Sequence, residues 1–151
     1  MVYAMIVRKK IKGTFREINQ GNAQPMLDAL ADQFVYVFHG QHALGGRRTS
    51  RDAMRQWWER VFRLLPGIHV DVHEIVVGGW PWDTHVAVKC VVRGNLPNGD
   101  LYSNTAFQFM SMKWGRITRI ETMEDTQLLE QALQVVAESG CAEALEPPIT
   151  G

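Results

Sequence analysis

The chain of 151 residues has little cysteine and no surplus of either charge, and each shortage excludes a class of protein. Two cysteines, Cys90 and Cys141, cannot build a disulfide framework, so we expect a protein of the reducing cytoplasm. Sixteen basic and sixteen acidic residues give a formal net charge of zero. This balance argues against nucleic acids and membranes as partners, because both attract a basic surplus.

Several motifs are also missing. No apolar run approaches the ~20 residues of a membrane span, and the basic residues 8–10 follow the first apolar stretch, which is the reverse of a secretory signal. Glycine-rich phosphate loops and Cys-x-x-Cys pairs do not occur, and we expect no cofactor. The length favours a single domain over 1–151, with 145–151 as a flexible tail.

Helical patterns occupy the first part and the end of the chain. Apolar residues recur at spacings of three and four from Val7 to Ile18, which predicts an amphipathic helix. Pro25 suits the first turn of a short second helix. Ser50 is a candidate cap for a third helix with a broad apolar face, and residues 127–138 are predicted to form the last one.

Strand patterns occupy the middle of the chain. A short aromatic and β-branched run predicts a first strand near 34–39. Turn residues then separate four longer predicted strands, at roughly 68–78, 85–94, 101–113 and 116–124. Helices first and a meander of long strands afterwards predict an α+β fold.

Three local motifs accompany this order of elements: Leu27-x-x-Leu30-Ala31-Asp32, Gly45-Gly46-Arg47-x-x-Ser50-Arg51-Asp52-Ala53, and Gly115-Arg116-Ile117-Thr118-Arg119-Ile120-Glu121 followed by Met123-Glu124-Asp125-Thr126. With them the chain resembles the nuclear transport factor 2-like superfamily, and within it the SnoaL-like, polyketide-cyclase-type branch. The resemblance extends from about Ile11 to Leu133.

The resemblance implies N-terminal helices packed on a strongly curved, mostly antiparallel sheet, together forming a cone with an internal apolar pocket. It implies a homodimer through the outer sheet face. The implied ligand is a small hydrophobic or cyclic metabolite, and the implied chemistry is that of a cofactor-free isomerase, cyclase, dehydratase or hydrolase. The alternative is a non-catalytic ligand-binding or dimeric interaction module, because one scaffold carries many activities.

Acid–base candidates lie in two places. Ketosteroid isomerases carry a carboxylate near the end of the first strand, whereas Val35–Gly40 has none. The nearest titratable groups are His39 and His42, which are either bases at neutral pH or loop histidines bonded to the backbone. Near the closing strand, Glu121 and Asp125 are the other candidates for an acid or base.

Alternation along that strand places Arg119, Glu121, Met123 and Asp125 on one face. If this face points inward, its apolar surroundings raise the pKa of the carboxyls. The alternative for Asp125 is a cap of the last helix.

Ligand contacts are expected from polar and aromatic side chains of the strands and the third helix: Tyr36, Trp57, Trp58, Asn104, Gln108 and Met123. The alternative for Asn104 and Gln108 is an outer face, and for the tryptophans a place in the core. His69-x-Asp71-x-His73 spreads its end residues about 13 Å apart, so we expect no metal site. An enzyme requires at least two such polar side chains to converge in a cavity of a few hundred Å³.

Overall fold

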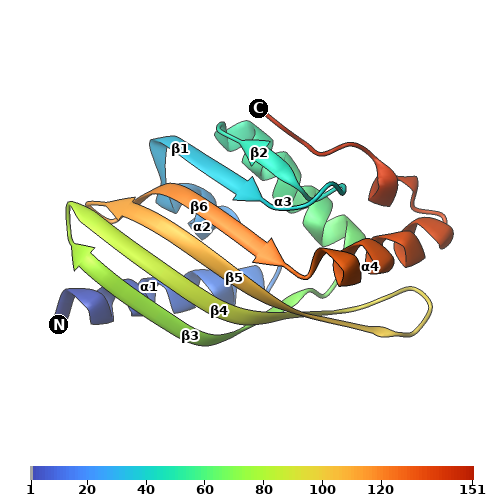
Figure 1. Ribbon diagram of the computed structural model, residues 1–151, viewed down its shortest axis with the longest axis horizontal. Helices are drawn as coiled ribbons and strands as arrows, with labels where there is room; N and C mark the ends of the chain where they lie inside the picture. Colours follow the sequence, from blue (N-terminus) through green and yellow to red (C-terminus); the bar gives the residue numbers. More distant parts are fainter. Residues whose placement is uncertain (1) are drawn as a thin grey trace.

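The computed structural model describes residues 2–151, and its centre is one mixed sheet of six strands in the order β2-β1-β6-β5-β4-β3 (Figure 1). The elements in chain order are α1 (Val2–Ile18), α2 (Gln24–Ala29), β1 (Leu30–Phe38), β2 (Gly46–Arg48), α3 (Arg51–Leu64), β3 (His69–Trp80), β4 (Asp83–Asn95), β5 (Leu101–Lys113), β6 (Arg116–Glu124), α4 (Thr126–Glu138) and the 3₁₀ turn η1 (Ala142–Leu145). The predicted α+β architecture is confirmed.

The helices α1, α2 and α3 lie behind the curved sheet, and α4 continues beyond the end of β6 (Figure 1). The buried residues of α1 run from Val7 to Ile18 at the spacing that predicted the helix. Ser50 caps α3, since its side chain accepts a hydrogen bond from the backbone N–H of Ala53 at 3.1 Å. No helix among residues 2–151 combines the length and apolarity that crossing a bilayer requires.

Two features of the sheet differ from the sequence prediction. The short strand β2 pairs antiparallel with β1 in a stretch for which the sequence predicts no strand. Three residues are too few to show an alternating pattern, so only pairing with a neighbour reveals them. The strand β1 begins at Leu30, directly after α2, and runs parallel to β6.

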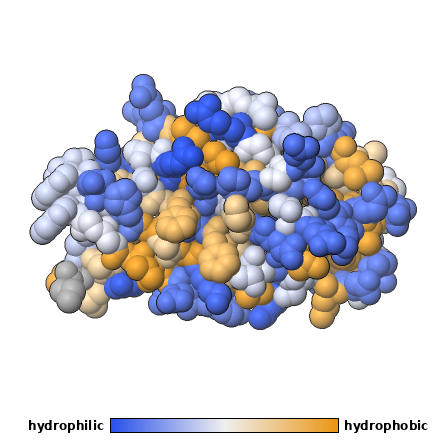
Figure 2. Space-filling model, in the orientation of Figure 1, coloured by the Kyte–Doolittle hydropathy of each residue, from blue (hydrophilic) through white to orange (hydrophobic). Residues whose placement is uncertain are grey.

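The two faces of the sheet differ in exposure. On β5, the residues Tyr102, Asn104 and Ala106 are buried against the helices, whereas Phe107 and Phe109 point away from them. Four apolar side chains near the middle of the outer face are each more than half exposed: Val76, Phe107, Phe109 and Met123. We call these four residues the outer patch, and Figure 2 shows apolar side chains gathered across the middle of this face.

The last residues, for which the sequence predicts a flexible tail, lie along β2 and α3. A guanidinium N–H of Arg48 donates to the carbonyl of Ile149 at 2.6 Å, and one of Arg60 donates to that of Pro147 at 2.9 Å. The backbone N–H groups of Thr49 and Ser50 both donate to the carbonyl of Gly151. These bonds hold residues 147–151 against β2 and α3.

Candidate functional site

A cavity of about 60 Å³ lies between the concave face of the sheet and the helices α1 and α3. Most of its wall is apolar and aromatic, and the polar groups come from neighbouring strands. Its lining residues are Phe15, Tyr36, Phe38, Leu44, Trp57, Trp58, Val61, Leu65, Ile68, Val70, Cys90, Val92, Ala106, Gln108, Thr122 and Glu124. Four predicted ligand contacts, Tyr36, Trp57, Trp58 and Gln108, are therefore brought together here.

The register between β5 and β6 explains how the polar groups meet. Gln108 lies opposite Thr122, and Ala106 lies opposite Glu124. Because side chains alternate along a strand, all four point to the same side of the sheet. The small side chain of Ala106 leaves room beside the carboxyl of Glu124.

Glu124 is the carboxyl group of the cavity. Burial raises its pKa from the usual 4.5 to about 7, although a hydrogen bond from Tyr102 acts in the opposite direction. A carboxyl with this pKa is about half ionised at neutral pH, so it can both accept and donate a proton there. Such a pKa is typical of groups that act as general acids or bases.

Two buried polar atoms of the wall have no hydrogen-bond partner among residues 2–151: Oε1 of Gln108 and Nε1 of Trp58. Buried polar groups are nearly always paired, and leaving one unpaired costs free energy. The neighbouring Trp57 shows the usual arrangement, because its Nε1 donates to the carbonyl of Leu44 at 2.8 Å. The cavity therefore offers one free donor and one free acceptor to a ligand or to water.

Tyr36 adds a third polar group. Its hydroxyl lies 3.4 Å from Oγ1 of Thr122, and burial raises its pKa to about 12, so the hydroxyl keeps its proton at neutral pH. The guanidinium of Arg48 lies over the rings of Tyr36 and Trp57, with its carbon 5.2 and 5.1 Å from their centroids. This stacking holds the two aromatic rings in place.

The structure does not place the predicted acid–base candidates in this cavity. Glu121 is opposite Phe109 on the outer face, and Nε2 of His39 lies 2.9 Å from its carboxylate. This contact, with that of Arg119, lowers the pKa of Glu121. The carboxylate of Asp125 accepts hydrogen bonds from the N–H groups of Gln127 and Leu128, which is the capping alternative.

Two predicted ligand contacts also lie elsewhere. Met123 is opposite Phe107 and belongs to the outer patch, so its side chain points away from the cavity. Asn104 does face inward but lies outside the cavity lining, where its amide bonds to Tyr102 and to the backbone of Asp125.

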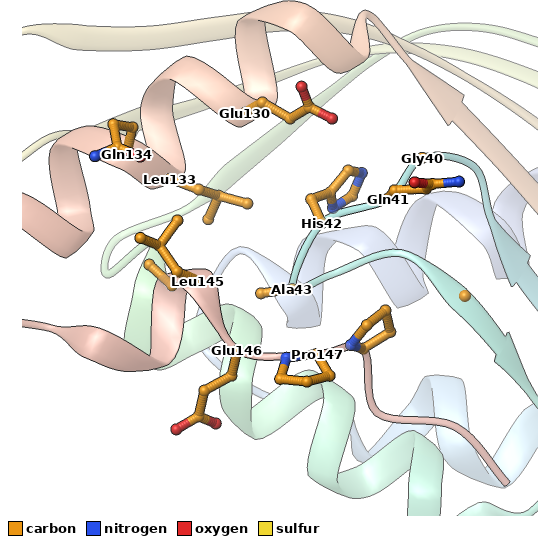
Figure 3. Close-up of a pocket in the computed structure, with 13 residues that line it drawn as sticks. Gly40, Gln41, His42, Ala43, Glu130, Leu133, Gln134, Leu145, Glu146 and Pro147 are labelled. Atoms are coloured by element: carbon orange, nitrogen blue, oxygen red, sulfur yellow. The ribbon is translucent and has the colours of Figure 1, made fainter.

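His42 lines a second hollow, an open cleft of about 680 Å³ between residues 40–46, α4 and residues 144–148 of η1 and the segment after it. Figure 3 shows His42 and Glu130 facing into it from opposite walls. Nε2 of His42 lies 3.1 Å from the carbonyl of His39, and Nδ1 accepts from the N–H of Leu44. Both ring nitrogens are thus engaged, and burial lowers the pKa of the ring. We therefore place the candidate site in the smaller cavity, where polar atoms are free.

The sequence prediction omits Glu124, because it considers only the other alternate set of the strand, with Glu121 and Asp125, for the inner face. Ile120 is fully buried, and alternation from Ile120 leads to Thr122 and then to Glu124. The central apolar residue of the strand was the available signal, since it marks the inner face. Among residues 2–151, no group of three potential ligand side chains is arranged to hold a metal ion.

A family model described as SnoaL-like domain matches residues 11–120. No curated protein sequence matches the chain. A crystal structure of TerC co-crystallised with polyporic acid is 16% identical, with a TM-score of 0.72 over 85% of this chain and 98% of that chain. Wild-type IdmH from Streptomyces antibioticus, proposed to be a polyketide cyclase, is 20% identical, with a TM-score of 0.68 over 87% of this chain and 98% of its own.

A third similar structure is Bal32a, from a soil-derived mobile gene cassette. It is 11% identical, with a TM-score of 0.73 over 85% of this chain and 97% of that chain. At such low identities these structures show that the fold is shared.

Proposed function

The chain belongs to the SnoaL-like domain family, and from this premise we propose that its interior cavity binds a small hydrophobic or cyclic metabolite and transfers a proton on it without a cofactor. The observation that carries the proposal is the meeting, in one cavity, of a carboxyl whose pKa is about 7 with two unpaired polar atoms. The co-crystal of the similar protein TerC with polyporic acid supports a role in binding small organic molecules.

Each polar group has a part in this proposal. Nε1 of Trp58 donates a hydrogen bond to a ligand oxygen, and Oε1 of Gln108 accepts one from a ligand hydroxyl. Glu124 takes up and returns the proton, so it replaces Asp125, Glu121, His39 and His42 as the proposed acid or base. Among the expected ligand contacts, Tyr36 and Trp57 remain with Trp58 and Gln108, whereas Asn104 and Met123 do not.

The size of the cavity sets a condition on binding. A volume of about 60 Å³ has room for about two water molecules and is below the few hundred Å³ expected of an enzyme site. A ring-sized ligand must therefore displace aromatic side chains of the wall. A ligand that also pairs Trp58 and Gln108 offsets the free-energy cost of this displacement through its hydrogen bonds.

The binding part of the proposal is tested with 2-naphthol, whose hydroxyl offers both an acceptor and a donor. We expect a Kd on the order of 100 μM, measured by fluorescence titration. Naphthalene, which lacks the hydroxyl, should bind about tenfold more weakly, because it leaves Trp58 and Gln108 unpaired.

Two variants localise this binding. Trp58→Phe should weaken 2-naphthol binding about tenfold, whereas Trp114→Phe, an exposed tryptophan between β5 and β6, should leave it unchanged. Equal binding of naphthol and naphthalene, or equal effects of the two variants, would contradict binding in the cavity.

The outer patch supports the second element of the proposal, a homodimer through the outer sheet face. Phe107 and Met123 lie opposite each other on β5 and β6, and Phe109 extends the same apolar surface. Contiguous exposed apolar surface of this kind is typical of association sites. An association site on this face also supports the alternative, in which the protein is a non-catalytic interaction module.

Phe109→Glu is expected to convert the dimer to a monomer, because the dimer would bury an unpaired charge on each protomer. Sedimentation velocity should give a mass near two chains for the natural protein and near one for the variant. Leu101→Glu places the same charge on an exposed leucine at the start of β5, away from the outer patch, and should leave the mass unchanged. A mass near one chain for the natural protein would contradict the dimer.

A further inference from the structure

Asn104 is buried behind the cavity wall, and its amide orientation is determined by the backbone of Asp125. Oδ1 of Asn104 accepts from the N–H of Asp125 at 3.2 Å, and Nδ2 donates to the carbonyl of Asp125 at 2.9 Å. The reversed amide would place the side-chain nitrogen against the N–H of Asp125 and the side-chain oxygen against its carbonyl, so neither pair could bond. The side-chain nitrogen of Asn104 therefore has a fixed position.

The second hydrogen of this nitrogen is directed at Tyr102. Nδ2 of Asn104 donates to the hydroxyl oxygen of Tyr102 at 2.8 Å. The hydroxyl of Tyr102, whose side chain is buried, must then direct its own hydrogen to another acceptor. The acceptor that the structure provides is Oε1 of Glu124, at 3.5 Å.

We propose that Asn104 and Tyr102 form a one-way hydrogen-bond chain that positions the carboxyl group of Glu124 and stabilises its ionised form. Tyr102 and Asn104 lie outside the cavity lining, so they are positioning residues that act through Glu124. This inference rests on the proposed function of Glu124 as the acid–base group of the cavity.

Within residues 2–151, no charged group near Glu124 competes with this hydrogen-bond chain for influence on its carboxyl. The titratable groups facing the carboxyl are Tyr36 from β1, Cys90 from β4 and Tyr102 from β5. Burial raises the pKa of each, to about 12 for Tyr36 and Cys90, so all three are neutral at physiological pH. Asp125, the next residue, directs its carboxylate to the start of α4.

The hydrogen-bond chain therefore opposes the effect of burial on the pKa of Glu124. Burial favours the neutral carboxyl, and the hydrogen bond from Tyr102 favours the carboxylate. Without Tyr102, the carboxyl would lose its proton only at a higher pH and would be a poorer base at neutral pH. The amide of Asn104 contributes by keeping the hydrogen of Tyr102 directed at Glu124.

The test is a direct titration of Glu124 in the full chain by carbon-13 NMR of labelled glutamate carboxyls. The signal of Glu124 is identified by its loss in Glu124→Gln. Tyr102→Phe is expected to raise the titration midpoint by about one pH unit, because it removes a hydrogen bond to the ionised form. Tyr36→Phe is the matched control, since it removes a hydroxyl that lies in the same cavity but bonds to Thr122; it should leave the midpoint unchanged.

A second variant keeps the inference testable if Tyr102→Phe does not fold. Asn104→Leu has nearly the same shape and no charge but offers no donor to Tyr102, so it no longer keeps the hydroxyl hydrogen directed at Glu124. It should also raise the midpoint.

The outcomes separate the two proposals. A natural midpoint near the ordinary glutamate value of about 4.3 would overturn the proposed function of Glu124. A natural midpoint near 7 that neither Tyr102→Phe nor Asn104→Leu raises, or that Tyr36→Phe raises equally, would overturn the hydrogen-bond chain alone.

Discussion

Glu124→Gln is expected to abolish proton transfer in the cavity and, above neutral pH, to make the protein more stable. The activity readout is the exchange of the acidic protons of 2-tetralone, a cyclic ketone, for deuterium in D₂O, followed by proton NMR. The natural protein should accelerate this exchange, and the variant should lose about 100-fold or more of the acceleration, because an amide cannot serve as a general base.

The stability effect follows from the raised pKa. In the unfolded chain Glu124 loses its proton near the usual 4.5, and in the folded protein near 7. Between these pH values the unfolded state binds fewer protons than the folded state, so the free energy of unfolding falls as pH rises. The stabilisation by the neutral carboxyl is complete below about pH 4 and lost by about pH 8. Glutamine stays neutral, so the variant should be more stable than the natural protein at pH 8 by roughly 3 kcal/mol.

Urea unfolding at pH 4 and at pH 8 measures this difference. Glu121→Gln is the matched control, because His39 and Arg119 lower the pKa of Glu121 in the folded protein. Loss of this carboxylate should therefore reduce the free energy of unfolding at pH 8. A Glu124→Gln protein that is less stable than the natural protein at pH 8 would contradict a raised pKa of Glu124 in the folded protein. Unchanged exchange of 2-tetralone in a folded variant would contradict the role of Glu124 as the base.

Arg48→Ala is expected to lower the free energy of unfolding by about 3–5 kcal/mol. The side chain of Arg48 is fully buried, and its guanidinium donates to the carbonyls of Gly45, Gly46 and Ile149. Burial lowers its pKa to about 10, so the group remains charged at neutral pH. Alanine would leave a cavity beside Tyr36 and Trp57 and would deprive these carbonyls of their donors.

The neighbouring Arg47 provides the control. Its side chain is exposed on the same short strand, so Arg47→Ala should change stability by no more than about 0.5 kcal/mol. Arg48→Met restores most of the volume without the hydrogen bonds, so its free energy of unfolding should lie between those of Arg48→Ala and Arg47→Ala. Denaturant unfolding of the three variants gives the comparison, and an Arg48→Ala protein within 1 kcal/mol of the natural stability would contradict the structural role.

The fold was predictable wherever local patterns repeat over many residues. The apolar stripe from Val7 to Ile18 and the four long strands extend over enough positions to identify their period. The strand β2 has three residues and was not predictable, because it forms only where β1 offers an edge. The family resemblance was confirmed by the match over residues 11–120.

The candidate site was predictable only in part. The aromatic residues Tyr36, Trp57 and Trp58 line the cavity, since large aromatic side chains on a core-facing element point inward. The proposed acid–base group, Glu124, was not predicted, because a shift of one residue in the inner face exchanges Glu124 for its neighbours.

The sequence by itself determined the class of fold, the absence of a charge surplus and the set of polar residues available to a site. Only the tertiary structure decided which of them meet. The register of β5 against β6 brings Gln108, Thr122 and Glu124 to one wall, and burial there changes the pKa of Glu124. Local periodicity reports the alternation of side chains along one strand, whereas register and desolvation depend on neighbours that are distant in the chain.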